Sequence, residues 1–162
     1  MKSYTELLEG VYDPNIFKAF FMAGGPGSGK SFAVQKGIGQ AQKGVKVTAQ
    51  GLKVVNSDDV FEKYLRDAQL NFKMDANQGK QRDALRTRAK EVTKKRRDNY
   101  VEGRLGMVID GTGKDYSKIT TQASGLKQLG YDVHMIFVNT SLDVALERNR
   151  QRPRSVPEDI VK

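Results

Sequence analysis

A chain of 162 residues is long enough for one domain with a substantial core, and 38% hydrophobic with 29% charged residues is typical of a globular protein. The sequence contains no cysteine, which excludes disulfides and thiolate metal sites, and no apolar run approaches the roughly 18 residues of a membrane span. The formal net charge is +9, and the basic residues are concentrated between positions 80 and 97.

Strands and helices are expected to alternate along the chain. A short helix over 3–10 precedes a strand over 17–23 and a helix over 29–43. A strand over 51–56, a helix over 59–70 and a long basic helix over about 78–102 follow. The last predicted elements are a strand over 105–110, a helix over 116–129 that ends at Gly130, a strand over 133–138 and a helix over 142–150. This order predicts an α/β fold with a parallel sheet covered on both faces, and ligands bound at the carboxyl ends of the strands.

The C-terminal residues resemble the beginning of a further helix. Residues 155–158 (SVPE) have the spacing of a capping box, with proline in the first turn, yet the sequence stops at Lys162. We therefore expect a single domain over residues 1–162 whose last segment is truncated or continues beyond this sequence.

Residues 24–31 read GGPGSGKS between a predicted buried strand and a predicted helix. In that context backbone N–H groups and a helix N-terminus converge on phosphate, and glycines allow the backbone to approach it closely. Lys30 can reach the β- and γ-phosphates, and the Ser31 hydroxyl can complete a Mg²⁺ shell. The residues expected to surround the nucleotide are Gly25, Pro26, Gly27, Ser28, Gly29, Lys30 and Ser31. The chain is thus predicted to bind ATP with Mg²⁺, and we expect it in the cytoplasm, where both are available.

Carboxylates follow two of the predicted strands. Asp58 comes directly after strand 51–56, where it could orient or deprotonate an accepting hydroxyl, and Asp59 is a second candidate. Either aspartate could instead be the N-cap of the next helix. Asp110 ends strand 105–110, where it could bind Mg²⁺ or substrate, and Thr112 and Lys114 in the turn after it are candidate substrate contacts.

The loop after the predicted helix 142–150 is rich in arginine. Arg148, Arg150, Arg152 and Arg154 alternate along it and could fold over a triphosphate, neutralising the charge on the transferred group. Arg148 and Arg152 are the preferred candidates, and a solvated basic loop is the alternative.

The predicted basic helix carries nine Lys or Arg residues between positions 80 and 97. Arg82, Arg86, Lys90, Lys94 and Arg97 would form one stripe, beside a narrow apolar seam of Leu85, Ala89 and Val92. The stripe is either a solvated helix face or a surface for a polyanion such as nucleic acid.

Four sequence blocks resemble the zeta-toxin and polynucleotide-kinase branch of P-loop kinases, namely residues 24–31, 54–58, 108–114 and 148–157. The resemblance implies a P-loop NTPase fold, a three-layer sandwich with strand order 2-3-1-4. It also implies ATP-dependent transfer to a hydroxyl and a mobile arginine-bearing lid. By the same resemblance Asp58 is the catalytic carboxylate, Asp110 lies on the substrate or metal side, and Arg152 contacts phosphate with support from Arg148. One departure is Phe61, because these families often carry Arg or Lys three residues after the catalytic aspartate to hold the substrate.

The leading functional hypothesis is a kinase that acts on a nucleic-acid 5′-hydroxyl or on a small metabolite such as a nucleotide sugar. The charge favours the polyanion, and block 108–114, which is most like zeta toxins, favours the nucleotide sugar. The alternatives are a P-loop ATPase and a nucleotide-binding module without an acceptor. An ATPase would need a water-activating Glu after strand 105–110, where Asp110-Gly111-Thr112 stands instead.

Overall fold

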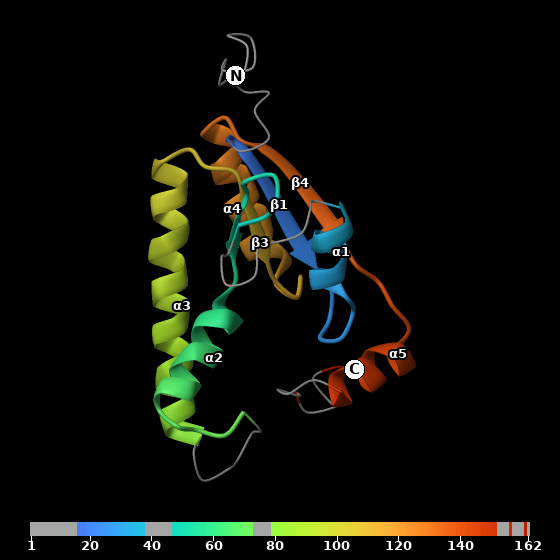
Figure 1. Ribbon diagram of the computed structural model, residues 1–162. Coiled ribbons are helices and arrows are strands. Elements are labelled where there is room, and N and C mark those ends of the chain that lie inside the picture. Colours follow the sequence, from blue (N-terminus) through green and yellow to red (C-terminus); the bar gives the residue numbers. More distant parts are fainter. Residues whose placement is uncertain (1–15, 38–46, 73–78, 152–155, 157–160, 162) are drawn as a thin grey trace, which may run out of the picture.

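The computed structural model describes residues 16–37, 47–72, 79–151, 156 and 161, and within them four parallel strands form one sheet (Figure 1). The strands are β1 (Lys18–Ala23), β2 (Lys53–Val55), β3 (Met107–Asp110) and β4 (Asp132–Phe137). The helices are α1 (Lys30–Gly37), α2 (Ser57–Asp67), α3 (Gly79–Glu102), α4 (Tyr116–Gln128) and α5 (Leu142–Arg150). The strand order β2-β3-β1-β4 confirms the predicted order 2-3-1-4 and the P-loop NTPase fold. The expected helix over 3–10 and residues 38–43 of the second expected helix lie outside the described residues.

The two faces of the sheet bury different apolar residues, because successive side chains of a strand point to opposite sides. Ala19 and Phe21 of β1 pack with Leu126 of α4 on one face, together with residues of α3. Met22 of β1 packs on the other face with Val108 and with partly buried residues of α1. Helices therefore cover both faces of the sheet, which is the expected three-layer arrangement.

Helices α2 and α3 lie side by side along one side of the molecule (Figure 1). Val60, Phe61 and Leu65 of α2 pack against Ala89 of α3 in a separate apolar cluster. The partly buried Leu85 and Val92 pack against the same cluster, which confirms the predicted apolar seam of this helix.

The strand register brings three carboxyl ends to the same level. Met22 of β1 is aligned with Asp110 of β3, and Val55 of β2 is aligned with Ile109. The loops after these strands therefore start next to one another, at the end of the sheet from which α1 and α2 begin (Figure 1). In the described part of the chain, no helix combines the length and apolar character needed to cross a bilayer.

Candidate active site

The loop between β1 and α1 is shaped by glycines that a larger residue could not replace. Gly27 and Gly29 have φ angles of +80° and +98°, a region that L side chains rarely adopt. A Cβ on Gly27 would lie 2.3 Å from the carbonyl oxygen of Ala145 in α5, and one on Gly29 would lie 3.2 Å from Nη1 of Arg148. The glycines thus allow α5 and its arginine to approach the loop directly.

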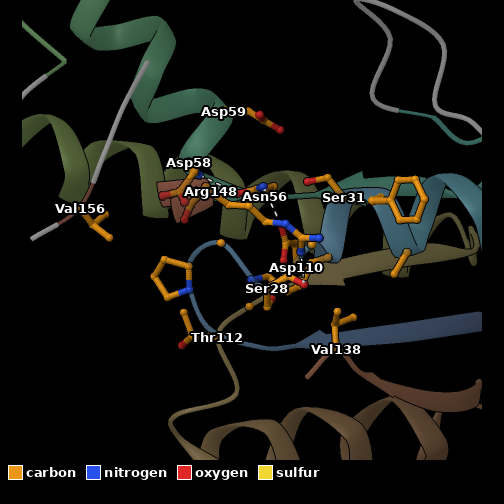
Figure 2. Close-up of a pocket in the computed structure, with 18 of the residues that line it drawn as sticks. Ser28, Ser31, Asn56, Asp58, Asp59, Asp110, Thr112, Val138, Arg148 and Val156 are labelled. Carbon is orange, nitrogen blue, oxygen red and sulfur yellow. Dashed lines mark hydrogen bonds between the residues drawn. The ribbon is translucent and has the colours of Figure 1, made fainter. Parts of the chain in front are cut away.

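A cavity of about 740 Å³ opens beside this loop, and we call it the central cavity. Its lining includes Pro26 to Ser31 of the loop and α1, Asn56 to Asp59 after β2, Asp110 to Thr112 after β3, and Arg148 of α5. Figure 2 shows Ser28, Asn56 and Asp110 near the middle of the labelled residues, with Asp59 apart from them. The volume is in the range of small-ligand sites.

Lys30 and Ser31 begin α1 at the edge of this cavity. The Lys30 ammonium donates to the carbonyl oxygens of Gly24 and Gly25, at 2.7 and 3.1 Å, so it lies over the glycine loop. The buried Ser28 hydroxyl has no hydrogen-bond partner among the described residues. A polar atom buried in a glycine-lined cradle beside an ammonium fits an anionic ligand such as a phosphate chain.

A Mg²⁺ ion bound with a nucleotide fits the residues present. Ser31 and Asp110 line the same cavity from α1 and β3. Mg²⁺ in such sites is held by one or two protein oxygens, phosphates and water, so a cluster of several carboxylates is not required. The described residues contain no group of three or more His, Cys, Asp or Glu that could hold a metal alone.

Asn56 connects three parts of the site and is a residue that sequence reasoning missed. Its Nδ2 donates to Oδ2 of Asp110 at 2.9 Å, and its Oδ1 accepts from the backbone N–H of Asp58 at 2.8 Å. Asn56 is therefore the N-cap of α2, which corrects the alternative that Asp58 or Asp59 is the cap. The signal was present in the sequence, since asparagine directly after a strand is a strong N-cap residue.

Asp58 lies in the first turn of α2 with its side chain 43% exposed. Its Oδ1 lies 3.3 Å from Nη1 of Arg86, which reaches it from α3. Asp59 also lines the central cavity, and Glu62, one helical turn after Asp58, lines it as well. Glu62 was not predicted as a site residue, and Arg86 was predicted as part of the basic stripe rather than beside Asp58. Nothing local in the sequence indicates that α3 covers this part of α2.

Arg148 was expected in the loop after residues 142–150, but it lies in the last turn of α5, from which it enters the central cavity. Its Nη1 donates to the carbonyl oxygen of Ser28 at 3.4 Å, on the nucleotide-loop side. Arg152 and Arg154 lie outside the described residues. The buried Asn149 beside Arg148 exchanges two hydrogen bonds with the backbone of Val156, of 2.8 and 3.1 Å, and Val156 also lines the cavity.

Thr112 and Lys114 follow β3 in a turn that is tied to the glycine loop. The Gly24 N–H donates to the Thr112 carbonyl at 3.1 Å, and a Cβ on Gly113, whose φ is +81°, would lie 2.8 Å from Cβ of Ala23. Thr112 lines the central cavity, and both residues line a second cavity of about 560 Å³ between α3 and α4, which we call the side cavity. Its cationic residues are Lys90, Lys94, Arg97, Lys114 and Lys118.

The predicted basic stripe of α3 is divided by the fold. Arg82 is buried, and its guanidinium donates to the carbonyl oxygens of Asn71 and Phe72, while Arg86 turns toward α2. Lys94 and Arg97 both pair with Asp98, and the Arg97 guanidinium holds the pKa of that carboxyl below its usual value. The stripe is therefore not one continuous solvent-facing surface, because part of it packs against α2.

Comparison with known proteins gives a family match over residues 20–162, to the family described as AAA domain (AAA_33). A search of the curated proteins found no match. Among solved structures, the chain is similar to one from a study of the PezAT chromosomal toxin–antitoxin system of Streptococcus pneumoniae. That likeness has a TM-score of 0.61 and 17% identity, and it covers 82% of this chain and 51% of that one.

Two further structures have the same fold. The AvrRxo1-ORF1:AvrRxo1-ORF2 complex with sulphate ions gives a TM-score of 0.64 at 16% identity, over 89% of this chain and 45% of that one. A candidate kinase from Chloroflexus aurantiacus gives 0.57 at 14% identity, over 83% of this chain and 66% of that one. The present chain thus spans about half to two thirds of these longer chains.

At these identities the structural likeness shows the fold alone. The family match and the fold together bear out the predicted resemblance to the zeta-toxin and kinase branch at the level of a P-loop domain. Because the match extends over most of the sequence, the chain belongs to the AAA_33 family of AAA domains.

Proposed function

We propose that the protein is a kinase that transfers the γ-phosphate of ATP to a hydroxyl group on an anionic acceptor. The acceptor is either the 5′ end of a nucleic acid or a small metabolite such as a nucleotide sugar. The observation that carries the proposal is that the glycine loop, Lys30 and Asp58 line a single cavity. A phosphate clamp and a carboxylate that can accept a proton are thereby available to the same substrate pair.

The proposed roles follow from these positions. Lys30 and Arg148 would neutralise charge on the triphosphate, and Ser31 and Asp110 would hold Mg²⁺, which supplies further charge neutralisation when bound. Arg152, which lies outside the described residues, is given the same role on the family resemblance alone. Asp58 would orient the acceptor hydroxyl and receive its proton. The hydroxyl oxygen forms the new bond to the γ-phosphorus, and the bond from that phosphorus to the bridging oxygen breaks. The electron pair of the broken bond remains on the terminal phosphate of ADP.

The side cavity supports an anionic acceptor. It shares Ser57, Asp110, Gly111 and Thr112 with the central cavity, so an acceptor bound beside Asp58 in the central cavity would extend into it. Its lining combines the apolar Ile109 and Ile119 with the five cationic residues named above and with three acidic ones, Glu91, Asp110 and Asp115. Apolar surface with convergent cations suits a sugar or base that carries phosphate.

We propose that this reaction takes place in the cytoplasm, within one domain that extends over residues 1–162.

The test is incubation with γ-labelled ATP and a panel of 5′-hydroxyl oligonucleotides, nucleotide sugars and polyols. Label on an acceptor that disappears in Asp58→Asn, with ATP binding retained, is the expected result. Asp59→Asn is the matched control, since Asp59 is the adjacent carboxylate, and it should retain most of the transfer activity. Steady release of phosphate with no labelled acceptor would favour an ATPase, and an Asp58→Asn variant of full activity would refute the assignment of Asp58.

A further inference from the structure

Three cations line the central cavity among the described residues, and they are Lys30, Arg86 and Arg148. Lys30 and Arg148 both donate to backbone carbonyls of the glycine loop, on the side where a triphosphate would bind. Arg86 instead reaches the cavity from α3 and contacts Asp58. Among the described residues that line the central cavity, Arg86 is therefore the cation on the Asp58 side.

Arg86 is held in place by a rigid support. Its guanidinium carbon lies 5.1 Å from the ring centroid of Phe61, a cation–π distance, and its Nη1 lies 3.3 Å from Oδ1 of Asp58. Phe61 is itself only 5% exposed, within the apolar cluster of α2 and α3. The ring thus fixes the guanidinium of Arg86 beside Asp58.

The ion pair between Arg86 and Asp58 contributes little to the folding stability. The side chains of Arg86 and Asp58 are 42% and 43% exposed, and ion pairs of that kind contribute roughly 0–1 kcal/mol. Arg88 makes a similar contact with Tyr64, at 5.2 Å, yet it lines none of the cavities described above. The two arginines therefore share cation–π packing on α2 and differ in the contact with Asp58 and in access to the cavity.

We propose that Arg86 is a specificity-determining residue that binds a phosphate group of the acceptor while it holds the Asp58 carboxylate toward the accepting hydroxyl. Arginine carries five N–H donors in a planar fork, so a guanidinium that contacts Asp58 through one nitrogen retains donors for a phosphate oxygen. The inference rests on the proposed function, because it assigns the acceptor side of the same cavity. It restricts the acceptor to molecules that carry phosphate close to the hydroxyl.

The test measures binding rather than turnover. Wild-type protein with Mg²⁺ and a non-hydrolysable ATP analogue is titrated calorimetrically with two pairs of probes. Adenosine 3′-monophosphate against adenosine represents a nucleic-acid end, and UDP-N-acetylglucosamine against N-acetylglucosamine represents a nucleotide sugar. We expect the phosphate-bearing member of at least one pair to bind tenfold or more tightly than its partner.

The variants separate recognition from packing. Arg86→Gln should remove most of this preference, and Arg86→Lys should restore part of it, while affinity for the ATP analogue changes less than twofold. Arg88→Gln is the matched control and should retain the full preference. Thermal melts of the variants then show whether any loss of binding follows a loss of folding.

Each outcome decides one proposal. A preference that survives in Arg86→Gln, a preference lost equally in Arg88→Gln, or no preference in the wild type would overturn the inference. If a probe is phosphorylated in an Asp58-dependent manner although Arg86→Gln keeps the preference, the kinase stands and the role of Arg86 falls. If Arg86→Gln abolishes the preference but no probe is phosphorylated, the phosphate site stands and the kinase proposal falls.

Discussion

Asn56 joins the end of β2 to Asp110 of β3 and caps α2, so its replacement should weaken the site and the fold together. Two substitutions separate these contributions. Asn56→Ser keeps a good N-cap residue and removes the donor to Asp110. Asn56→Asp also keeps a capping oxygen, but it places a second carboxylate against Asp110.

The expected magnitudes follow from the 2.9 Å contact between Asn56 and Asp110. A hydrogen bond to a charged group contributes about 1.5–3 kcal/mol, and partial exposure of this pair places the cost of Asn56→Ser near the lower end of that range. Two like charges at about 4 Å repel by about 4 kcal/mol in an effective dielectric of about 20, and exposure reduces this to about 1–2 kcal/mol. Asn56→Asp loses the same hydrogen bond as Asn56→Ser and adds this repulsion, so at pH 8 it should be the less stable of the two variants.

The pH dependence gives the sharper test. Folded Asn56→Asp can retain one proton shared between the two carboxyls when the unfolded chain has released it, so its stability falls as the pH rises. Between pH 8 and pH 5 the shared proton begins to restore a hydrogen bond, so the stability deficit of Asn56→Asp relative to Asn56→Ser should shrink.

Urea unfolding followed by circular dichroism at pH 5 and pH 8 measures both variants. Asn99→Asp, on the exposed surface of α3, is the control for added charge and should change stability by no more than about 0.5 kcal/mol at either pH. If the two Asn56 variants have equal stability at both pH values, the contact between Asn56 and Asp110 is refuted.

Three further predictions concern the loop, the core and the surface charge. Gly27→Ala should weaken binding of an ATP analogue at least tenfold and destabilise the fold by about 1–3 kcal/mol, because its Cβ would collide with the Ala145 carbonyl at a φ of +80°. Gly37→Ala at the end of α1, where a Cβ meets nothing within 4 Å, is the control and should do neither. Burial raises the pKa of Tyr131 above its usual 10.0, so the stability that this hydroxyl contributes is present below pH 10 and is lost as the pH rises through the folded pKa. Tyr131→Phe also loses the hydrogen bond to the Leu105 carbonyl, worth about 1 kcal/mol. In alkaline unfolding, the free energy of unfolding of Tyr131→Phe should therefore fall less steeply above pH 10 than that of the wild type. Oligonucleotide binding to the exposed lysines of α3 should weaken steeply between 50 and about 200 mM salt, and salt-independent affinity measured by fluorescence anisotropy would contradict a nucleic-acid acceptor.

Local patterns predicted much of this molecule. The glycine loop at 24–31 could be assigned because a strand, a turn and a helix follow one another in sequence, and the turn chemistry depends on those residues alone. The apolar seam of α3 was likewise visible, since helical periodicity shows which face is buried. Strand order was expected through family resemblance, because residue patterns alone do not specify which parallel strands become neighbours.

The missed residues are those whose role depends on a distant partner. Asn56 contacts Asp110, which is 54 positions away, and Arg86 contacts Asp58, which is 28 positions away. Arg82 was expected in a solvent-facing stripe and is instead buried, because α2 and the residues after it cover that end of α3. Periodicity identifies a face of a helix, but not the element that covers it.

What the amino-acid sequence determined by itself is the phosphate-binding loop and the alternation of strands and helices, because both arise from interactions between near neighbours in the chain. The tertiary structure alone decided which side chains share the cavity with that loop. The register of parallel strands and the packing of α2 on α3 brought Asp58, Arg86 and Asp110 to one place. Such contacts form between residues far apart in sequence, where the energy of packing the whole fold, rather than any local preference, sets the geometry.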